Sequence, residues 1–294
     1  MKLAFLIQCH KSPAQINMLL EQLAHPDVDI YIHVDKKSNI CDQITTNTHV
    51  HLLPDHLRID VQWGTFSIVL SAINLLSYAT QNGQYEYFWL ISGQDFPIKS
   101  VHSILQFLQE NKGNNFIDLC KTKYNGFQRG TRLDKRAELF FPVWMMNRKF
   151  HIRILRRLYL AITGGYSNTF YFFKRKNVDR IRPHFGSAWW CLYSDFVKYI
   201  LDFIQRYPED FLFFKNVLCS DESFFQTMLM NSHFAGSQRD YLHYIDWPIQ
   251  ASSPKNLLAS DFNAIIQSGK FMTRKIDNNI ELINLLKAYA QSQQ

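Results

Sequence analysis

Glycine is scarce in this sequence, and the phosphate-binding loops that depend on it are missing. None of the 11 glycines among 294 residues forms a G-x-x-x-x-G-K-[ST] or a G-x-G-x-x-G pattern. Kinases and dehydrogenases usually hold their nucleotide with such loops, so both classes lose their usual support. A G-x-S-x-G elbow is also absent, and an esterase would therefore need an unusual nucleophile.

Cysteines and paired acids are equally sparse. The five cysteines are scattered and none forms a C-x-x-C pair, which favours reduced thiols over a zinc site or a redox couple. Asp27-Val28-Asp29 is the one D-x-D triplet, and it precedes the second predicted strand, at the wrong end of the sheet for a nucleotide site. We predict a surface loop there.

Long apolar runs are missing as well. No stretch approaches the roughly 18 residues that a membrane span needs. The N-terminal run ends at Gln8 and Cys9, too early for a signal peptide. The sequence therefore predicts a cytoplasmic protein.

The residues that are present predict an α/β fold. Strands are expected at residues 2–8, 30–34 and 85–91. One helix is expected to begin at Pro13 with Ser12 as its N-cap, and another near residue 65. This order predicts a mostly parallel central sheet flanked by helices. Ligands collect at the carboxyl ends of such strands, where His10, Asp35 and Asp95 are expected to meet.

The second half predicts a strand at 188–192, a helix at 195–206 capped by Ser194 or Asp195, and a helix that opens at residues 220–223. We find no internal repeat or linker. We therefore predict a single domain over residues 1–294, with a nucleotide-binding part at about 1–120 and an acceptor and catalytic part at 183–294.

Positive charge is concentrated between these two parts. Residues 121–182 hold 16 lysines and arginines against three acidic residues, whereas the remainder holds 16 against 22. Such a segment suits an anionic partner. Within residues 148–160, Phe150, Ile154, Leu155 and Leu158 have helical spacing among basic residues, which fits either a helix packed on the core or one docked on a membrane.

Two polar clusters are candidates for chemistry. Glu222 precedes Phe224 and Phe225, and burial against aromatic rings would raise its pKa and suit a general base, although acidic residues at a helix start are equally well explained by the helix dipole. Arg274 and Lys275 lie in a basic turn that could neutralise a departing diphosphate. A solvated basic turn is the alternative.

Seven short motifs occur in order along nearly the whole chain. They are residues 4–11, 31–38, Gln62-Trp63-Gly64 with Ser67, 89–99, 186–190, 221–227 and 274–277. The ordered set resembles the core-2/I-branching β-1,6-N-acetylglucosaminyltransferase family, which also includes the peptide O-xylosyltransferases. The resemblance implies a GT-A-like fold with a Rossmann-like sheet, an inverting mechanism, a UDP-sugar donor and no metal or other cofactor.

The resemblance also assigns roles by position. Glu222 matches the general base that deprotonates the acceptor hydroxyl. Asp35 matches a residue that holds the uridine, with His10 nearby in the nucleotide pocket. Lys275 matches a basic residue on the diphosphate, and Lys255 roughly matches a second one.

On the acceptor side, the resemblance implies an aromatic residue that packs on the sugar. Either Tyr244 or Trp247 could serve, and Trp189 is expected nearby. Ala188 replaces an acidic residue of the xylosyltransferase branch, which favours N-acetylglucosamine transfer from UDP-GlcNAc. UDP-xylose or another UDP-hexose is the alternative donor.

The expected context is bacterial. The chain lacks the membrane anchor, stem and disulfide pattern of the animal enzymes, so we expect a soluble enzyme of surface polysaccharide or lipooligosaccharide synthesis with a lipid-linked acceptor. Its basic segment would rest on the inner face of the plasma membrane. A carbohydrate- or nucleic-acid-binding protein is the non-enzymatic alternative, but it leaves the ordered motifs unexplained, and no nucleic acid is expected as partner.

Overall fold

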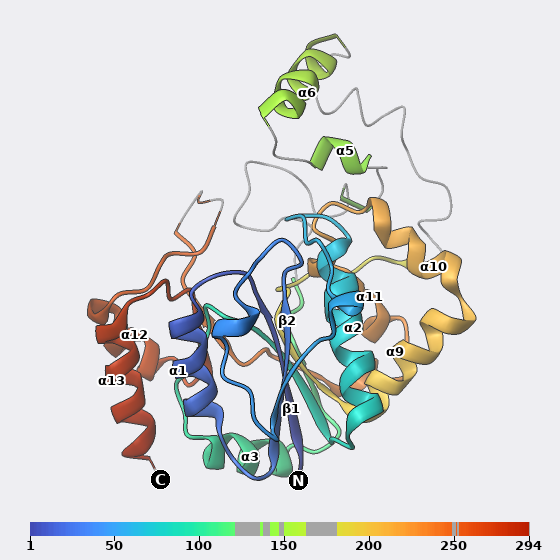
Figure 1. Ribbon diagram of the computed structural model, residues 1–294. Coiled ribbons are helices and arrows are strands. Elements are labelled where there is room, and N and C mark those ends of the chain that lie inside the picture. Colours follow the sequence, from blue (N-terminus) through green and yellow to red (C-terminus); the bar gives the residue numbers. More distant parts are fainter. Residues whose placement is uncertain are drawn as a thin grey trace.

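The computed structural model of the protein describes residues 1–120, 136–137, 142–146, 150–162, 181–248, 251 and 253–293. Its centre is a seven-stranded sheet in the order β3-β2-β1-β4-β7-β6-β8 (Figure 1). Neighbouring strands pair in parallel except that β7 is antiparallel to β4 and to β6. The prediction of a mostly parallel sheet is confirmed. The strands are β1 (Leu3–Cys9), β2 (Val28–Val34), β3 (Val50–Leu52), β4 (Tyr87–Ser92), β6 (Asn115–Ile117), β7 (Trp190–Tyr193) and β8 (Gln238–Arg239).

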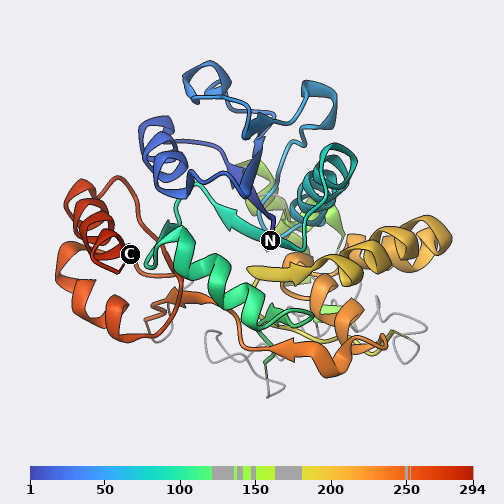
Figure 2. The ribbon, with the colours of Figure 1, turned by 90° about the horizontal axis from the view of Figure 1, so that it is seen from below.

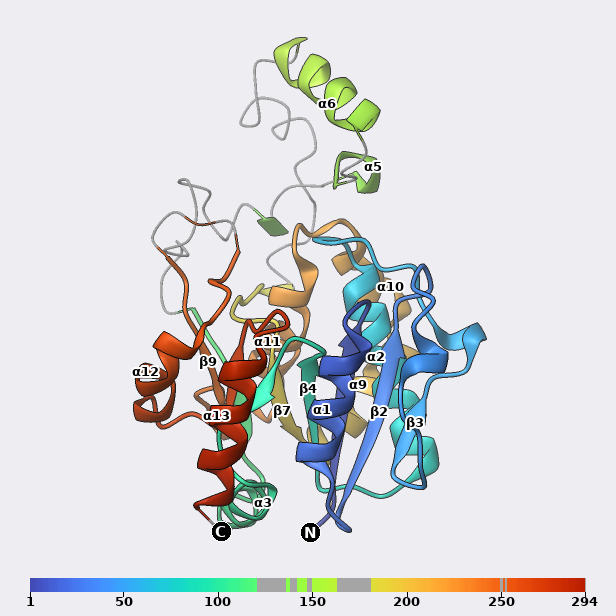
Figure 3. The ribbon, with the colours of Figure 1, turned by 60° about the vertical axis from the view of Figure 1, so that its left-hand side comes forward.

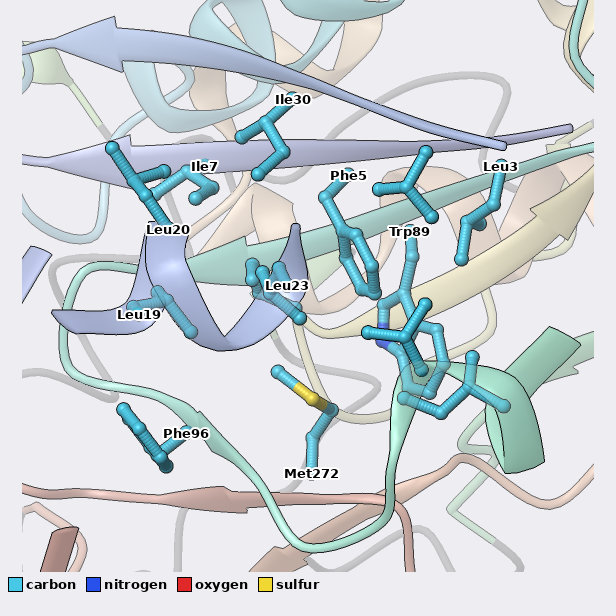
Figure 4. Packing of buried hydrophobic residues seen from close by; sticks show 14 of the residues in the cluster. Leu3, Phe5, Ile7, Leu19, Leu20, Leu23, Ile30, Trp89, Phe96 and Met272 are labelled. Carbon is cyan, nitrogen blue, oxygen red and sulfur yellow. The ribbon is translucent and has the colours of Figure 1, made fainter. Parts of the chain in front are cut away.

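Helices cover both faces of this sheet because its central strands are apolar on both sides. Leu3, Phe5 and Ile7 of β1 belong to one buried cluster, which Figure 4 shows packed against the first helix. The alternate residues Ala4 and Leu6 belong to a second cluster on the other face. The helices are α1 (Pro13–Leu23), α2 (Ser67–Asn82), α3 (Val101–Glu110), α5 (Val143–Met146), α6 (Phe150–Ile162), α9 (Ser194–Arg206), α10 (Pro208–Leu212), α11 (Phe224–Met230), α12 (Phe262–Gln267) and α13 (Ile280–Gln291).

Helices α1 and α3 lie on the same side as α12 and α13, whereas α2, α9 and α11 lie on the opposite side (Figure 2). Short 3-10 turns connect several of these elements. They are η1 (Cys41–Gln43), η2 (Asp55–Leu57), η3 (Phe213–Asn216), η4 (Ser220–Glu222), η5 (Ala235–Ser237) and η6 (Ala259–Asp261).

A second, three-stranded sheet joins the end of the chain to the first half. It has the order β5-β10-β9, formed by β5 (Phe96–Pro97), β10 (Met272–Arg274) and β9 (His243–Ile245). The buried Gln15 of α1 reinforces this junction, since its side chain donates to Ile276 O at 3.2 Å and accepts from Asn278 N at 2.7 Å. Helix α13 consequently lies close to α1 (Figure 3), and residues 274–277 lie beside the end of β4.

Three predicted helix starts differ in detail from the structure. Ser12 precedes α1, with Pro13 in its first turn as predicted, but its side chain makes no capping hydrogen bond. Helix α9 begins at Ser194 itself, so neither Ser194 nor Asp195 is the cap, and Tyr193 precedes it. Residues 220–222 form a 3-10 turn, and α11 begins only at Phe224. Glu222 therefore does not lie in the first turn of an α-helix.

The basic segment contributes a helix that stands away from the sheet. Helix α6 confirms the helix predicted from the spacing of residues 148–160 (Figure 1). Ile154, Leu155 and Leu158 are 43%, 53% and 56% exposed, so the prediction of a helix packed on the core is wrong. None of the helices that the structure describes is long and apolar enough to cross a bilayer.

Candidate active site

A cavity of about 620 Å³ lies at the carboxyl ends of β1, β2 and β4. The first half of the chain lines it with residues 8–11, 33, 35 and 92–94. The second half contributes residues 186–189, 221–222, 247 and 274–275. Segments that are far apart in sequence therefore share one site.

Most of the predicted site residues meet in this cavity. Those that line it are His10, Asp35, Trp189, Glu222, Trp247, Arg274 and Lys275. Asp95, Tyr244 and Lys255 are not among its lining residues. The Lys255 ammonium instead contacts a carboxylate oxygen of Asp261 at 2.6 Å. Of the two aromatic candidates for the acceptor side, Trp247 is the one that lines the cavity.

Asp35 lies directly after β2, in a turn whose backbone carbonyls accept hydrogen bonds from Arg58. The Arg58 guanidinium donates to the carbonyls of Val34, Asp35 and Ser38 at 2.9, 3.1 and 3.0 Å. Ser38 Oγ in turn donates to His10 O at 2.7 Å, so the loops after β1 and β2 are held together. Burial lowers the pKa of His10. Sequence analysis missed Arg58, because its hydrogen bonds go to backbone atoms that carry no sequence signal.

Asp95 has a different position from the predicted one. It is completely buried, and its carboxylate accepts from Ser92 N at 2.8 Å, from Ser92 Oγ at 2.7 Å and from Arg274 Nη1 at 3.1 Å. Burial by itself would raise the pKa of Asp95, but the charge of Arg274 and the nearby imidazole of His243, whose Nε2 lies 3.5 Å from Oδ2, outweigh it and hold the pKa below its usual value. Asp95 therefore contacts Arg274 from beneath the cavity wall.

Arg274 is held from a second side by Trp189. Its guanidinium carbon lies 4.1 Å from the centroid of the Trp189 ring, a cation-π contact. Lys275 follows on the cavity wall, and burial, together with the charges of Arg274 and Lys11, lowers its pKa. Lys11 also lines the cavity and forms a 2.8 Å ion pair with Asp277. Three cations thus line the cavity. Asp95 and Asp277 already contact two of them, Arg274 and Lys11, and a diphosphate placed there would be an additional anion for this group.

Glu222 also lines the cavity, as does Phe225. The Glu222 side chain is 31% exposed, so the aromatic rings do not bury it completely. Its Oε2 accepts from Arg136 Nη1 at 2.6 Å. Burial, and then the charge of Glu222, raise the pKa of the adjacent Asp221 to about 7. Two neighbouring carboxyl groups therefore differ in environment.

A glycine, Gly186, allows two backbone segments of the cavity wall to approach each other closely. An added Cβ at Gly186 would lie 1.9 Å from the carbonyl oxygen of Asp118, so only glycine fits. Gly186 N donates to Glu222 O at 2.9 Å, and Ser187 N donates to Asp118 Oδ2 at 2.8 Å. Sequence analysis missed Asp118, which lines the cavity and whose pKa is raised by burial. These bonds fix the segment that carries Ala188 and Trp189.

No group of three or more histidine, cysteine or acidic side chains suited to a metal ion occurs among the residues that the structure describes. Asp29 of the D-x-D triplet lies at the start of β2, away from the cavity as expected, although it belongs to the strand and not to a loop. Its carboxylate accepts from Tyr85 OH at 2.7 Å and contacts His49 Nδ1 at 2.7 Å. These contacts give Asp29 a structural role.

The family model described as Core-2/I-Branching enzyme matches residues 3–265 of this chain. The chain belongs to this family. The match confirms the family predicted from the ordered motifs and, with the mostly parallel sheet, the predicted glycosyltransferase type of α/β fold.

Curated relatives of the family are similar over nearly the whole chain. Xylosyltransferase 2 of Rattus norvegicus is 24% identical over 97% of this chain and 33% of its own length. Xylosyltransferase oxt of Drosophila melanogaster is 24% identical over 97% and 33%, and xylosyltransferase 1 of Homo sapiens is 23% identical over 98% and 30%. The chain spans about a third of the length of the relatives it matches.

Similarity to solved structures is more distant. The mannosyltransferase Ktr4p of S. cerevisiae has a TM-score of 0.35 and 12% identity, over 76% of this chain and 65% of that one. TarS of S. aureus, residues 1–349, has a TM-score of 0.28 and 13% identity, over 50% of this chain and 43% of that one.

Proposed function

We propose that this protein is an inverting glycosyltransferase that moves N-acetylglucosamine from UDP-GlcNAc to a hydroxyl of a glycan, in a β-1,6 linkage and without a metal ion. One observation carries the proposal. A single cavity holds His10 and Asp35 for the nucleotide, Arg274 and Lys275 for a diphosphate, and Glu222 for an acceptor hydroxyl.

The reaction is a single displacement at the anomeric carbon. Glu222 takes the proton of the acceptor hydroxyl, whose oxygen forms a bond to that carbon as the bond to the UDP oxygen breaks. The electron pair of the broken bond leaves with the diphosphate. Arg274 and Lys275 stabilise the charge that develops there, and attack from the opposite face inverts the configuration.

For the donor sugar, a specific observation favours an alternative to UDP-GlcNAc. Ala188 lines the cavity. The family resemblance implies an acidic residue at this position in the xylosyltransferase branch, and this difference supports UDP-GlcNAc as the donor. The curated relatives are named xylosyltransferases, and their names favour UDP-xylose. If Ala188 selects the donor, Ala188→Asp should lower the activity ratio of UDP-GlcNAc to UDP-xylose.

The acceptor is proposed to be lipid-linked, in surface polysaccharide or lipooligosaccharide synthesis, at the inner face of the plasma membrane. Helix α6 supports membrane contact, since Arg153, Arg156 and Arg157 alternate along it with the exposed Leu155 and Leu158. The protein should bind to vesicles rich in anionic lipid, and the variant in which both leucines are changed to glutamate should not bind to them. Equal retention of that variant would remove α6 from the contact.

Most of residues 121–182 lies outside the described residues, so the nucleic-acid-binding alternative for this segment stays a prediction. Phosphate-driven binding would weaken steeply with salt.

The first test is thermal stabilisation by UDP, UDP-GlcNAc, UDP-xylose, UDP-glucose and UDP-galactose, each with EDTA and with manganese. Selective binding raises the unfolding midpoint. The proposal expects the largest shift from UDP-GlcNAc in EDTA. A larger shift with UDP-xylose would replace the donor, a shift that requires manganese would remove metal independence, and no response to any uridine nucleotide would contradict the proposed function.

A further inference from the structure

Arg136 is a buried cation that the proposed reaction does not use. It belongs to the basic segment, yet only 1% of its side chain is exposed. A charged side chain is rarely buried so deeply without an anion, because loss of hydration is costly. Burial acts to lower the pKa of Arg136, but the Glu222 carboxylate outweighs burial and raises it. The guanidinium is therefore a permanent positive charge in contact with Glu222.

The contact occupies one oxygen of Glu222 and leaves the other available. Arg136 Nη1 donates to Oε2 at 2.6 Å, whereas in the described part of the chain Oε1 accepts no hydrogen bond. The backbone of Glu222 is fixed separately, since its N–H donates to Cys219 O at 3.0 Å and its carbonyl accepts from Gly186 N at 2.9 Å. With the backbone fixed, the ion pair restricts the orientation of the carboxylate.

We infer that Arg136 is a positioning residue, which holds Oε2 of Glu222 so that Oε1 is directed to the acceptor as an ionised proton acceptor. The inference rests on the proposed function, because it assigns a partner to the proposed base. A neighbouring cation makes a carboxylate a weaker base, but it also keeps the carboxylate ionised and oriented. Orientation raises the fraction of enzyme molecules whose Glu222 can accept the proton of the acceptor hydroxyl.

Other titratable groups surround this ion pair. Asp221 is adjacent, with a pKa raised to about 7 by burial and then by Glu222. The pKa of Cys120 is raised to about 11, by burial and then by Asp118 and Glu222, and Cys219 interacts with Arg136. The Arg136 guanidinium interacts with Glu222, Cys219 and Asp221, so its removal would change the electrostatic environment of all three side chains.

The test compares Arg136→Met and Arg136→Lys with the unaltered protein, using a soluble acceptor. Arg136→Met should lower kcat roughly 10- to 100-fold and move the acidic limb of the pH–rate profile up by about one pH unit, with UDP affinity unchanged. Arg136→Lys should recover part of both losses, because it restores the charge. Arg206→Met, which removes an arginine of α9 that is 71% exposed, serves as the control.

A second readout needs no activity. The side-chain 13C resonance of Glu222, identified by its loss in Glu222→Gln, should titrate at higher pH in Arg136→Met. A loss of kcat with both the pH limb and this titration unmoved would overturn the inference and leave Arg136 a purely structural role. Absence of transfer by the unaltered protein with every donor would instead contradict the proposed function, whatever the titration shows.

Discussion

On the proposed nucleotide side of the cavity, His10 and Asp35 follow directly on β1 and β2, and their loops are joined by hydrogen bonds from Arg58 and Ser38 to backbone carbonyls. In the part of the cavity around Glu222, that residue lies in a 3-10 turn, and its position depends on contacts with segments around residues 118, 136 and 186. The first side depends on the order of parallel strands. The second depends on contacts between distant segments, so single substitutions should act differently on the two sides.

The largest expected effect is a loss of catalytic rate on substitution of Glu222, with nucleotide binding retained. Glu222→Gln should lower kcat by about 10²- to 10⁴-fold, because the amide cannot accept the proton, while UDP affinity stays nearly unchanged. Steady-state kinetics and calorimetric UDP binding measure the two quantities. Asp221→Asn is the matched variant, and a greater loss of kcat there would make Asp221 the base.

The second effect concerns stability beneath the nucleotide side. Asp95→Ala should lower the free energy of unfolding by about 3–5 kcal/mol, since it leaves Arg274 largely buried without its carboxylate partner. Urea unfolding measures the change. Asp195→Ala is the control, because Asp195 pairs with Lys198 on the surface of α9 and should contribute less than about 1 kcal/mol. An equal decrease in the free energy of unfolding in the two variants would show that the buried Asp95–Arg274 pair contributes no more to stability than a surface ion pair.

A smaller effect tests the diphosphate wall. Lys275→Ala should raise the apparent KM for the donor on the order of tenfold and slow departure of the leaving group, because one of the cations on that wall is removed. Lys270→Ala is the matched control, since Lys270 contacts Asp240 and does not line the cavity. Activity that is indifferent to Lys275→Ala would remove Lys275 from the site.

The last prediction concerns the pH dependence of stability near Glu222. The pKa of Asp221 is about 7 in the folded protein and lies near 3.9 in an unfolded chain, so the folded state binds the proton more tightly. This stabilisation is present at low pH and is lost as the pH rises from about 4 to 7. Asp221→Asn should remove that dependence and raise stability at pH 8 by on the order of 2 kcal/mol relative to the unaltered protein. Identical pH dependence of the unfolding midpoint in both proteins would contradict the assignment.

Much of the fold could be predicted because hydrophobic patterning is local. The apolar runs at the first strands and the helical spacing between them predicted the parallel sheet, and the spacing at residues 148–160 predicted α6. The exposure of α6 could not be predicted, because the same apolar stripe fits a core or a surface. Ser12 is the N-cap residue of α1 as predicted, although its side chain forms no capping hydrogen bond, whereas the cap predicted at Ser194 or Asp195 was wrong. Capping depends on backbone geometry that residue types only bias.

The sequence by itself determined which chemical groups are available, their order along the chain and the family, because strand ends and motifs are properties of short stretches. Only the tertiary structure decided what those groups face. It buried Asp95 beneath Arg274, left Lys255 outside the cavity wall and brought Arg136 to Glu222. Long-range burial and charge pairing set these positions, and neither is encoded in the spacing of any one segment.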